Sequence, residues 1–167
     1  LVLTPLATRW RTPALRLAFA GAVAGGALFA AVVYQFGPHL VARERNFFGV
    51  RQVFDVEGVR IMMHGNTGHG AQSLDPARQD VPRMYYHPST PMGRLVAAQG
   101  EQATIGLIGL GTGALAALAH PEQRLVFFEI DPLSEAMARE HFTYLADTPA
   151  AVEVIIDDGR LAVDDVP

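Results

Sequence analysis

The longest apolar stretch of the chain is residues 17–36, about 20 positions without a charge. This length is enough to cross the hydrocarbon core of a bilayer, so a transmembrane helix is expected over residues 14–36, after a polar tail at 1–13. Gly21 and Gly25, with Ala22 and Gly26 beside them, provide a small-residue face on which membrane helices pack closely. Other transmembrane helices are therefore expected as partners. A signal peptide and a buried soluble helix are the alternative interpretations.

After this run the pattern changes to short strands. Gly37 and Pro38 are expected to end the helix, and residues 37–46 are predicted to be a polar linker. Residues 47–54 and 59–63 are rich in β-branched and large apolar side chains, which predicts a β-hairpin with Gly58 in its turn. Residues 64–72 contain two His-Gly pairs without periodicity, which predicts a loop. We assign residues 47–98 to a small N-terminal β region and loop.

Residues 99–167 alternate between strands and helices. Strands are predicted at 104–108, 125–131 and 152–156, and helices at 114–119 and 132–141. Asp131 and Pro132 suit the N-cap and first position of the second helix. This order predicts an α/β fold: a partial Rossmann-like domain preceded by a small β-hairpin domain and one transmembrane helix.

Charge is distributed unevenly along the 167 residues. The net charge is −4, but residues 1–51 hold six arginines and one acid, whereas the remainder holds seven arginines and sixteen acids. An acidic soluble part disfavours nucleic acid as a partner and suits a cationic substrate. The absence of cysteine excludes disulfides and thiolate metal sites. Because the chain begins without methionine and stops soon after the third α/β strand, we expect it to be part of a longer protein.

The candidate chemistry lies where the predicted strands end. Gly109, Gly111 and Gly113 follow the first strand at alternate positions, which permits a tight turn and close approach to a ligand. This spacing suits both the dinucleotide fingerprint, completed by Ala114, and the first loop of S-adenosylmethionine enzymes. The second strand ends in an acid about 20 residues after the first glycine, where nucleoside-binding folds hold a ribose hydroxyl. The third strand ends in Asp157, Asp158 and Gly159. His64, His69 and His87 could in principle form a metal site, but without Cys or an ordered carboxylate nearby none is expected.

Together these segments resemble the spermidine synthase (aminopropyltransferase) family. The chain is most similar to membrane-embedded, spermidine-synthase-like bacterial proteins in which transporter-like helices precede the enzyme-like domain. The similar stretches cover residues 45–160: Arg45 to Val50, His64 to Gln72, Tyr85-Tyr86, Ile108 to Gly113, Phe128 to Pro132 and Asp158-Gly159.

The resemblance implies a role for each matching residue. Glu129 would hold the ribose hydroxyls, Asp158 would accept from the adenine amino group, and the glycines of the loop would line the nucleoside. Gln72 and Tyr86 would face the aminopropyl or methionine end of the co-substrate, which is S-adenosylmethionine or its decarboxylated form. The implied chemistry is attack of a substrate amine on the carbon next to a sulfonium.

Several departures from the family pattern affect this interpretation. Thr112 stands where synthases commonly have an acid that holds the ammonium of the decarboxylated co-substrate. The family's Tyr-His-Glu becomes Tyr86-His87-Pro88, and Gln72 is further than usual from the preceding glycine motif. The family's proton-accepting Asp follows a fourth strand, which this chain does not reach. We therefore leave the catalytic residue unassigned and expect the chain as given to be inactive by itself.

The leading hypothesis is a membrane-anchored aminopropyltransferase-like protein with an amine as second substrate. An S-adenosylmethionine-dependent methyltransferase and a non-catalytic nucleotide-sensing domain of a transporter remain as alternatives. Residues before and after the apolar run carry three arginines each, so the positive-inside rule does not give its orientation. We expect the bacterial inner membrane, with the soluble part in the cytoplasm because nucleoside cofactors are kept there. A homo-oligomer is left open.

Overall fold

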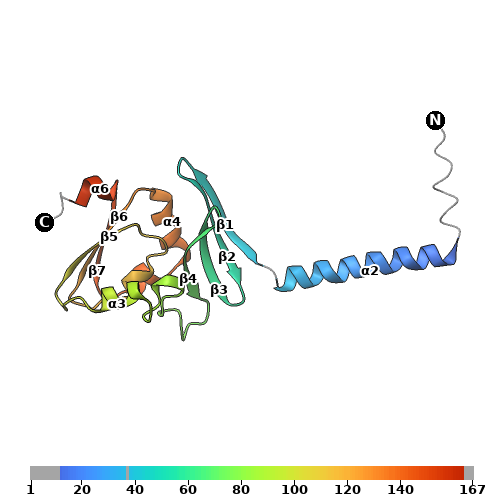
Figure 1. Ribbon diagram of the computed structural model, residues 1–167, viewed down its shortest axis with the longest axis horizontal. Helices are drawn as coiled ribbons and strands as arrows, with labels where there is room; N and C mark the ends of the chain where they lie inside the picture. Colours follow the sequence, from blue (N-terminus) through green and yellow to red (C-terminus); the bar gives the residue numbers. More distant parts are fainter. Residues whose placement is uncertain (1–11, 37, 164–167) are drawn as a thin grey trace. The chain divides into compact units, whose positions relative to one another are not determined.

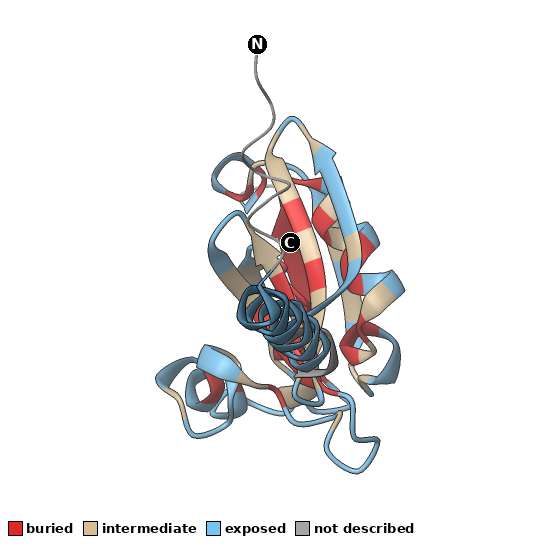
Figure 2. Ribbon diagram, turned by 90° about the vertical axis from the view of Figure 1, so that its right-hand side faces the viewer, coloured by how far each residue is buried: buried red, intermediate tan, exposed pale blue. Residues whose placement is uncertain are grey.

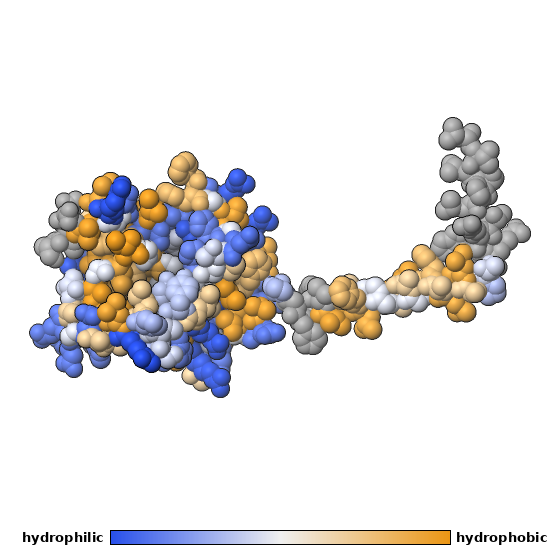
Figure 3. Space-filling view, in the orientation of Figure 1, coloured by the Kyte–Doolittle hydropathy of each residue, from blue (hydrophilic) through white to orange (hydrophobic). Residues whose placement is uncertain are grey.

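The computed structural model describes residues 12–36 and 38–163, which divide into two units at Pro38. The first unit contains α2 (Pro13–Phe36), whose proline lies in the first turn, where a missing N–H costs nothing. By length and composition this helix could cross a membrane, and none of its most apolar window is buried within the chain. Helices near an N-terminus that serve as signal sequences meet the same criterion. Figures 2 and 3 show α2 as exposed and mainly apolar. Most of the expected polar tail, and Gly37, lie outside the described residues.

The second unit begins with four antiparallel strands in the order β1-β2-β3-β4 (Figure 1). They are β1 (His39–Asn46), β2 (Gly49–Val56), β3 (Val59–His64) and β4 (Thr67–Ser73). The predicted hairpin is confirmed as β2 and β3. Two expectations are wrong: the supposed linker at 37–46 contains β1, and the supposed loop at 64–72 is largely β4. Their polar residues suit strands because β1 is an exposed edge strand and β4 buries small residues.

A parallel sheet follows, in the order β5-β6-β7, with β6 in the centre. Its strands are β5 (Thr104–Ile108), β6 (Arg124–Glu129) and β7 (Ala151–Ile156). All three predicted strands are present, although β6 ends two residues before the predicted limit. The connecting elements are η1 (Met84–Tyr86), α3 (Pro91–Ala97), η2 (Ala114–Leu118), α4 (Pro132–His141), α5 (Tyr144–Asp147) and α6 (Gly159–Ala162).

The helix expected after the glycine loop is a 3-10 helix, η2, which begins after Gly113 in a left-handed conformation. The expectation for α4 is confirmed, because Asp131 is its N-cap and accepts from Leu133 N at 2.9 Å.

One core joins the two sheets. Val53 of β2 and Met62 of β3 pack in the same buried cluster as Leu125 and Phe127 of β6. Val126 and Phe128 point to the opposite face of β6, where they pack with Ala162 of α6. The Leu125 and Phe127 face of β6 thus packs the parallel sheet against the small antiparallel sheet, and β6 is buried on both faces. The carboxyl ends of β5, β6 and β7 are thereby held at one edge.

Candidate functional site

The glycine turn begins where β5 ends, and β6 holds it in place. Gly109 N donates to the carbonyl oxygen of Phe128 at 2.7 Å. Leu110 N donates to Glu129 Oε2 at 3.0 Å, and Asp131 N donates to Glu129 Oε1 at 3.0 Å. One carboxylate therefore ties the loop after β5 to the turn after β6. Glu129 is 7% exposed, so these bonds are largely shielded from water.

Glu129 still has acceptor capacity. An ionised carboxylate offers about four lone-pair directions, of which the two backbone N–H groups use one on each oxygen. A neighbouring diol could donate to the remaining pair. Glu129 thus holds the two turns together and still has lone pairs that can accept hydrogen bonds from a ligand.

A cavity of about 210 Å³ lies beside this carboxylate. Residues from the ends of all three parallel strands line it: Ile108, Gly109, Phe128, Glu129, Ile130, Asp158 and Gly159. Ile108 is 74% exposed and Ile130 is 49% exposed, so its apolar walls are open to solvent. A flat apolar group with hydroxyls at one end would match these walls and the carboxylate.

Asp158 supplies the second carboxylate. It is the N-cap of α6, with Oδ1 accepting from Arg160 N at 2.9 Å, while Oδ2 lies 3.6 Å from the exposed Arg160 guanidinium. The structure therefore brings Gly109, Glu129 and Asp158 to one cavity, although they lie up to 49 positions apart in the sequence.

The other two glycines of the loop, Gly111 and Gly113, pack closely against other residues of the protein. A Cβ built on Gly111 would lie 2.5 Å from the His69 carbonyl oxygen, and one on Gly113 would lie 2.6 Å from Leu145 Cγ. A Cβ on Gly109 would meet no atom within 4 Å. All three have positive φ, so each requires glycine for its backbone, but only Gly109 opens onto the cavity.

Gln72 and Tyr86 lie outside the lining of this cavity. The Gln72 amide accepts from Thr143 N at 3.1 Å and donates to Thr143 Oγ1 and the Gln79 carbonyl, so both of its ends are engaged within the fold. The Tyr86 hydroxyl would lie 3.5 Å from a Cβ on Gly111. Burial, together with Tyr85 and Glu129, raises the pKa of Tyr86, so its phenol stays protonated at neutral pH.

The sequence did not indicate the polar contacts that join the small sheet to the turn after β6. Arg51 donates to Asp131 at 2.7 Å, and Asn46 donates to the other oxygen of the same carboxylate. Burial, Arg51 and His64 lower the pKa of the neighbouring His69, while Glu129 opposes them. Long-range pairs of this kind leave no local pattern, so only the N-cap role of Asp131 was detectable beforehand.

Thr112 is fully buried, with its methyl and hydroxyl against Gly70, and its hydroxyl has no hydrogen-bond partner among the described residues. Within residues 12–36 and 38–163, no three His, Cys, Asp or Glu side chains gather as metal ligands. His64 is bonded to the Phe48 carbonyl, and His87 to Ser89.

No protein-family model and no curated protein matches the chain. Its structure is similar to that of a spermidine synthase in complex with the transition-state analogue AdoDATO, with a TM-score of 0.55 and 16% identity over 76% of this chain and 42% of that chain. It is also similar to the spermidine synthase from Thermotoga maritima, with a TM-score of 0.56 and 16% identity over 76% and 44% of the two chains. A probable spermidine synthase from Corynebacterium glutamicum gives a TM-score of 0.56 and 18% identity over 72% and 46%.

This likeness supports the expected α/β architecture: a small antiparallel sheet followed by a parallel sheet, as in the spermidine synthase structures. The chain spans less than half the length of each of these proteins.

Proposed function

We propose that the cavity at the ends of β5, β6 and β7 binds the nucleoside part of S-adenosylmethionine or its decarboxylated form. The observation that carries this proposal is the convergence of Gly109, Glu129 and Asp158 on one apolar-walled cavity. Glu129 accepts the ribose hydroxyls with its free lone pairs, and Asp158 accepts from the adenine amino group. Ile108 and Ile130 cover the faces of the base.

The size of the cavity suggests that it holds only the nucleoside part of the co-substrate. Pockets for drug-sized ligands commonly measure about 300–1,000 Å³, so a cavity of this volume suits a nucleoside rather than the whole co-substrate. The sulfonium end extends past Gly109 towards the loop that carries Tyr86. In the proposed reaction an amine attacks the carbon beside the sulfonium, the C–S bond breaks, the thioether leaves neutral and the amine loses a proton. Aminopropyl transfer is the reaction that the fold favours.

Methyl transfer is the second candidate, and Thr112 favours it. A neutral, buried hydroxyl provides no charge to hold the free ammonium of the decarboxylated co-substrate. Without that charge, the position gives no preference for the decarboxylated form over ordinary S-adenosylmethionine. The two reactions differ in co-substrate, so binding measurements can separate them.

Calorimetry on the full chain tests both the ligand and the site. S-adenosylmethionine, its decarboxylated form and methylthioadenosine should bind, and NAD should not. Asp158→Asn should weaken nucleoside binding about tenfold, the loss of one hydrogen bond to a charged group, whereas Asp157→Asn should leave it unchanged. Asp157 is the matched control because it is the neighbouring exposed acid, does not line the cavity, and as asparagine can still accept the hydrogen bond from Asp158 N. Preference for NAD, or equal effects of the two substitutions, would overturn the proposal.

We also propose that α2 anchors the chain in the bacterial inner membrane with residues 39–167 in the cytoplasm. Its length, its lack of charge over residues 17–36 and its small-residue face support an anchor that packs on other transmembrane helices.

A further inference from the structure

A second and larger cavity lies in the segment between β4 and β5. It measures about 550 Å³, more than twice the volume of the nucleoside cavity, and shares no lining residue with it. None of its lining residues takes part in the proposed nucleoside binding. Its polar lining consists of two arginines, a histidine and two hydroxyl residues: Arg78, Arg83, His87, Ser89 and Thr90.

The arginines that line this cavity, Arg78 and Arg83, give it a positive charge. No carboxylate contributes to its lining, although the chain as a whole is acidic. Asp75 pairs with Arg78 only at 3.7 Å, and both side chains are more than half exposed, so the pair is weak. Asp80 lines a different cavity, next to Tyr144. Within the described part of the chain, no carboxylate lies within ion-pair distance of Arg83.

His87 adds a further donor. Its Nδ1 accepts from Ser89 N at 3.2 Å and lies 2.8 Å from Ser89 Oγ. With Nδ1 as the acceptor, the ring proton lies on Nε2, which can donate to a negatively charged neighbour.

The cavity wall is held in shape before any ligand arrives. Thr90 Oγ1 donates to the His87 carbonyl at 2.7 Å and accepts from Gly93 N at 3.2 Å, which caps α3. Met84, at the start of η1, has φ of 59°, an uncommon left-handed conformation for a residue with a side chain. Strained residues of this kind cluster at ligand clamps. Met84 and Val81 supply the apolar part of the wall.

We propose that this cavity binds a small molecule carrying an oxyanion, a phosphate or a carboxylate, through the guanidinium groups of Arg83 and Arg78. Arginine presents paired N–H donors that match either group bidentately, and His87 Nε2 provides a third donor. A polyamine would be repelled there. The site is separate from the nucleoside cavity and does not depend on the function proposed for it.

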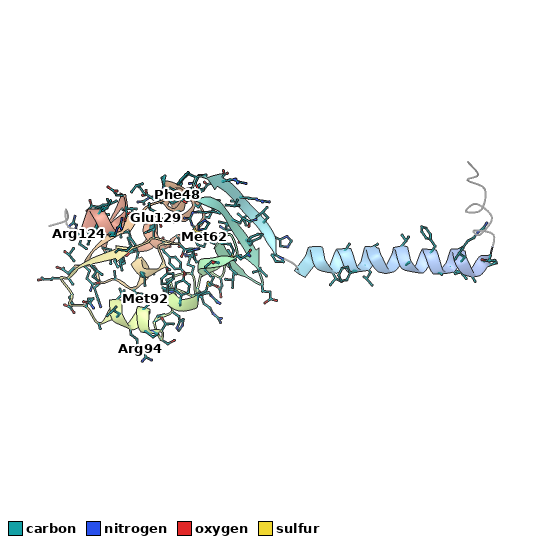
Figure 4. All side chains as sticks on the ribbon, turned by 45° about the horizontal axis from the view of Figure 1, so that its top comes forward. Phe48, Met62, Met92, Arg94, Arg124 and Glu129 are labelled. Carbon is teal, nitrogen blue, oxygen red and sulfur yellow. The ribbon has the colours of Figure 1, made fainter. Side chains whose placement is uncertain are left out.

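Calorimetry on the full chain tests the proposal with inorganic phosphate, malonate and spermidine as probes. At least one of the two anions should bind, and which one binds distinguishes a phosphate ligand from a carboxylate ligand. Arg83→Gln should weaken that binding about tenfold or more, because a charge-assisted hydrogen bond is lost. Arg94→Gln is the matched control: Arg94 points outward from α3 (Figure 4) and does not line the cavity.

Binding of neither anion, binding of spermidine in their place, or equal effects of the two arginine substitutions would overturn the inference. Labelling of the unmodified chain with phenylglyoxal avoids any loss of fold in a variant. The binding anion should protect Arg83 from modification and leave Arg94 reactive, whereas equal labelling with and without it would contradict the site. S-adenosylmethionine should not protect Arg83, which separates this result from that of the nucleoside cavity.

Discussion

Arg51 Nε donates a hydrogen bond of 2.7 Å to Asp131 Oδ2, across 80 residues of sequence, and both side chains are buried. Asn46 binds the second oxygen of the same carboxylate. Asp131 is also the N-cap of α4. The pair therefore joins β2 of the small sheet to the turn directly after Glu129. Burial by itself raises the pKa of Asp131, but the hydrogen bonds from Arg51 and Asn46 outweigh it and hold the pKa below its usual value.

Removal of one partner of this pair should destabilise the protein strongly. We expect Asp131→Ala to lower the free energy of unfolding by about 3 kcal/mol or more, because Arg51 is left buried without its partner. Asp55→Ala, which breaks the more exposed Arg60 pair within the small sheet, should cost less. Urea denaturation measures both. Equal losses of unfolding free energy in the two variants would show that burial adds nothing to the contribution of the Arg51–Asp131 pair.

The same pair predicts a pH dependence. Because the folded-state pKa of Asp131 is lowered, its contribution is present above the unfolded value of about 3.9 and is lost as the pH falls through the folded value. The stability difference between wild type and Asp131→Ala should therefore be constant near neutrality and shrink in acid. A difference that persists unchanged below pH 3 would contradict this assignment.

The glycine loop should respond differently at two of its positions. Alanine at Gly109 or Gly111 is strained by positive φ, at a cost of about 1–2 kcal/mol. Gly111→Ala adds a clash with the His69 carbonyl and should be the less stable variant. Gly109→Ala should instead reduce nucleoside binding, since its methyl group enters the open cavity. Thermal unfolding measures the stability of the two variants, and calorimetry measures their nucleoside binding. A less stable Gly109→Ala, or weaker binding by Gly111→Ala than by Gly109→Ala, would contradict this arrangement of the loop.

Gln72 should prove structural. Gln72→Ala leaves Thr143 N without its acceptor and should cost about 1–3 kcal/mol of stability, with little change in nucleoside binding. Gln99→Ala removes an exposed amide on the chain surface and serves as the control. A large loss of ligand affinity in a Gln72 variant of normal stability would favour the direct ligand contact that the family resemblance implies.

His69 should titrate below the unfolded value of about 6.5. As the pH falls below that value, the unfolded chain takes up the proton first, so His69 lowers stability in mild acid. His69→Gln should therefore lose less stability than wild type between pH 7 and pH 5. An NMR titration measures the imidazole directly, and a midpoint above that of the urea-unfolded chain would disprove the expected direction.

The anchor is tested by fractionation. The full chain should remain in the membrane fraction after carbonate washing, and deletion of residues 1–38 should release it, since the chain divides into two compact units after Pro38. Ala24→Arg places a charge near the middle of α2 and should weaken insertion by about 3 kcal/mol. A mature chain that begins after residue 36 would identify the segment as a signal peptide instead.

The parts of the fold that the sequence predicted are those with a local signal. Alternating and buried apolar runs gave β2, β3 and the three parallel strands, and Asp131-Pro132 marked the start of α4. By contrast, β1 and β4 were missed because their residues are polar or small, and their strand conformation depends on pairing with β2 and β3. The β-propensity of single residues predicts a strand poorly where pairing with neighbouring strands determines the conformation.

The same distinction holds at the candidate site. Gly109, Glu129 and Asp158 were predictable because parallel strands bring their carboxyl ends to one edge. The contacts of Gly111 and Gly113 with His69 and Leu145, and of Arg51 with Asp131, join residues distant in sequence. No local pattern records such contacts.

The two hydrogen bonds that Glu129 accepts, from Leu110 N and Asp131 N, have an evolutionary consequence. A descendant that lost all activity would still need this carboxylate to close its two turns, so selection for folding alone would retain it. Asp158, which caps only a four-residue helix at the surface, is under no such constraint. Among descendants, drift at Asp158 rather than at Glu129 should therefore mark the lineages in which the pocket has fallen out of use.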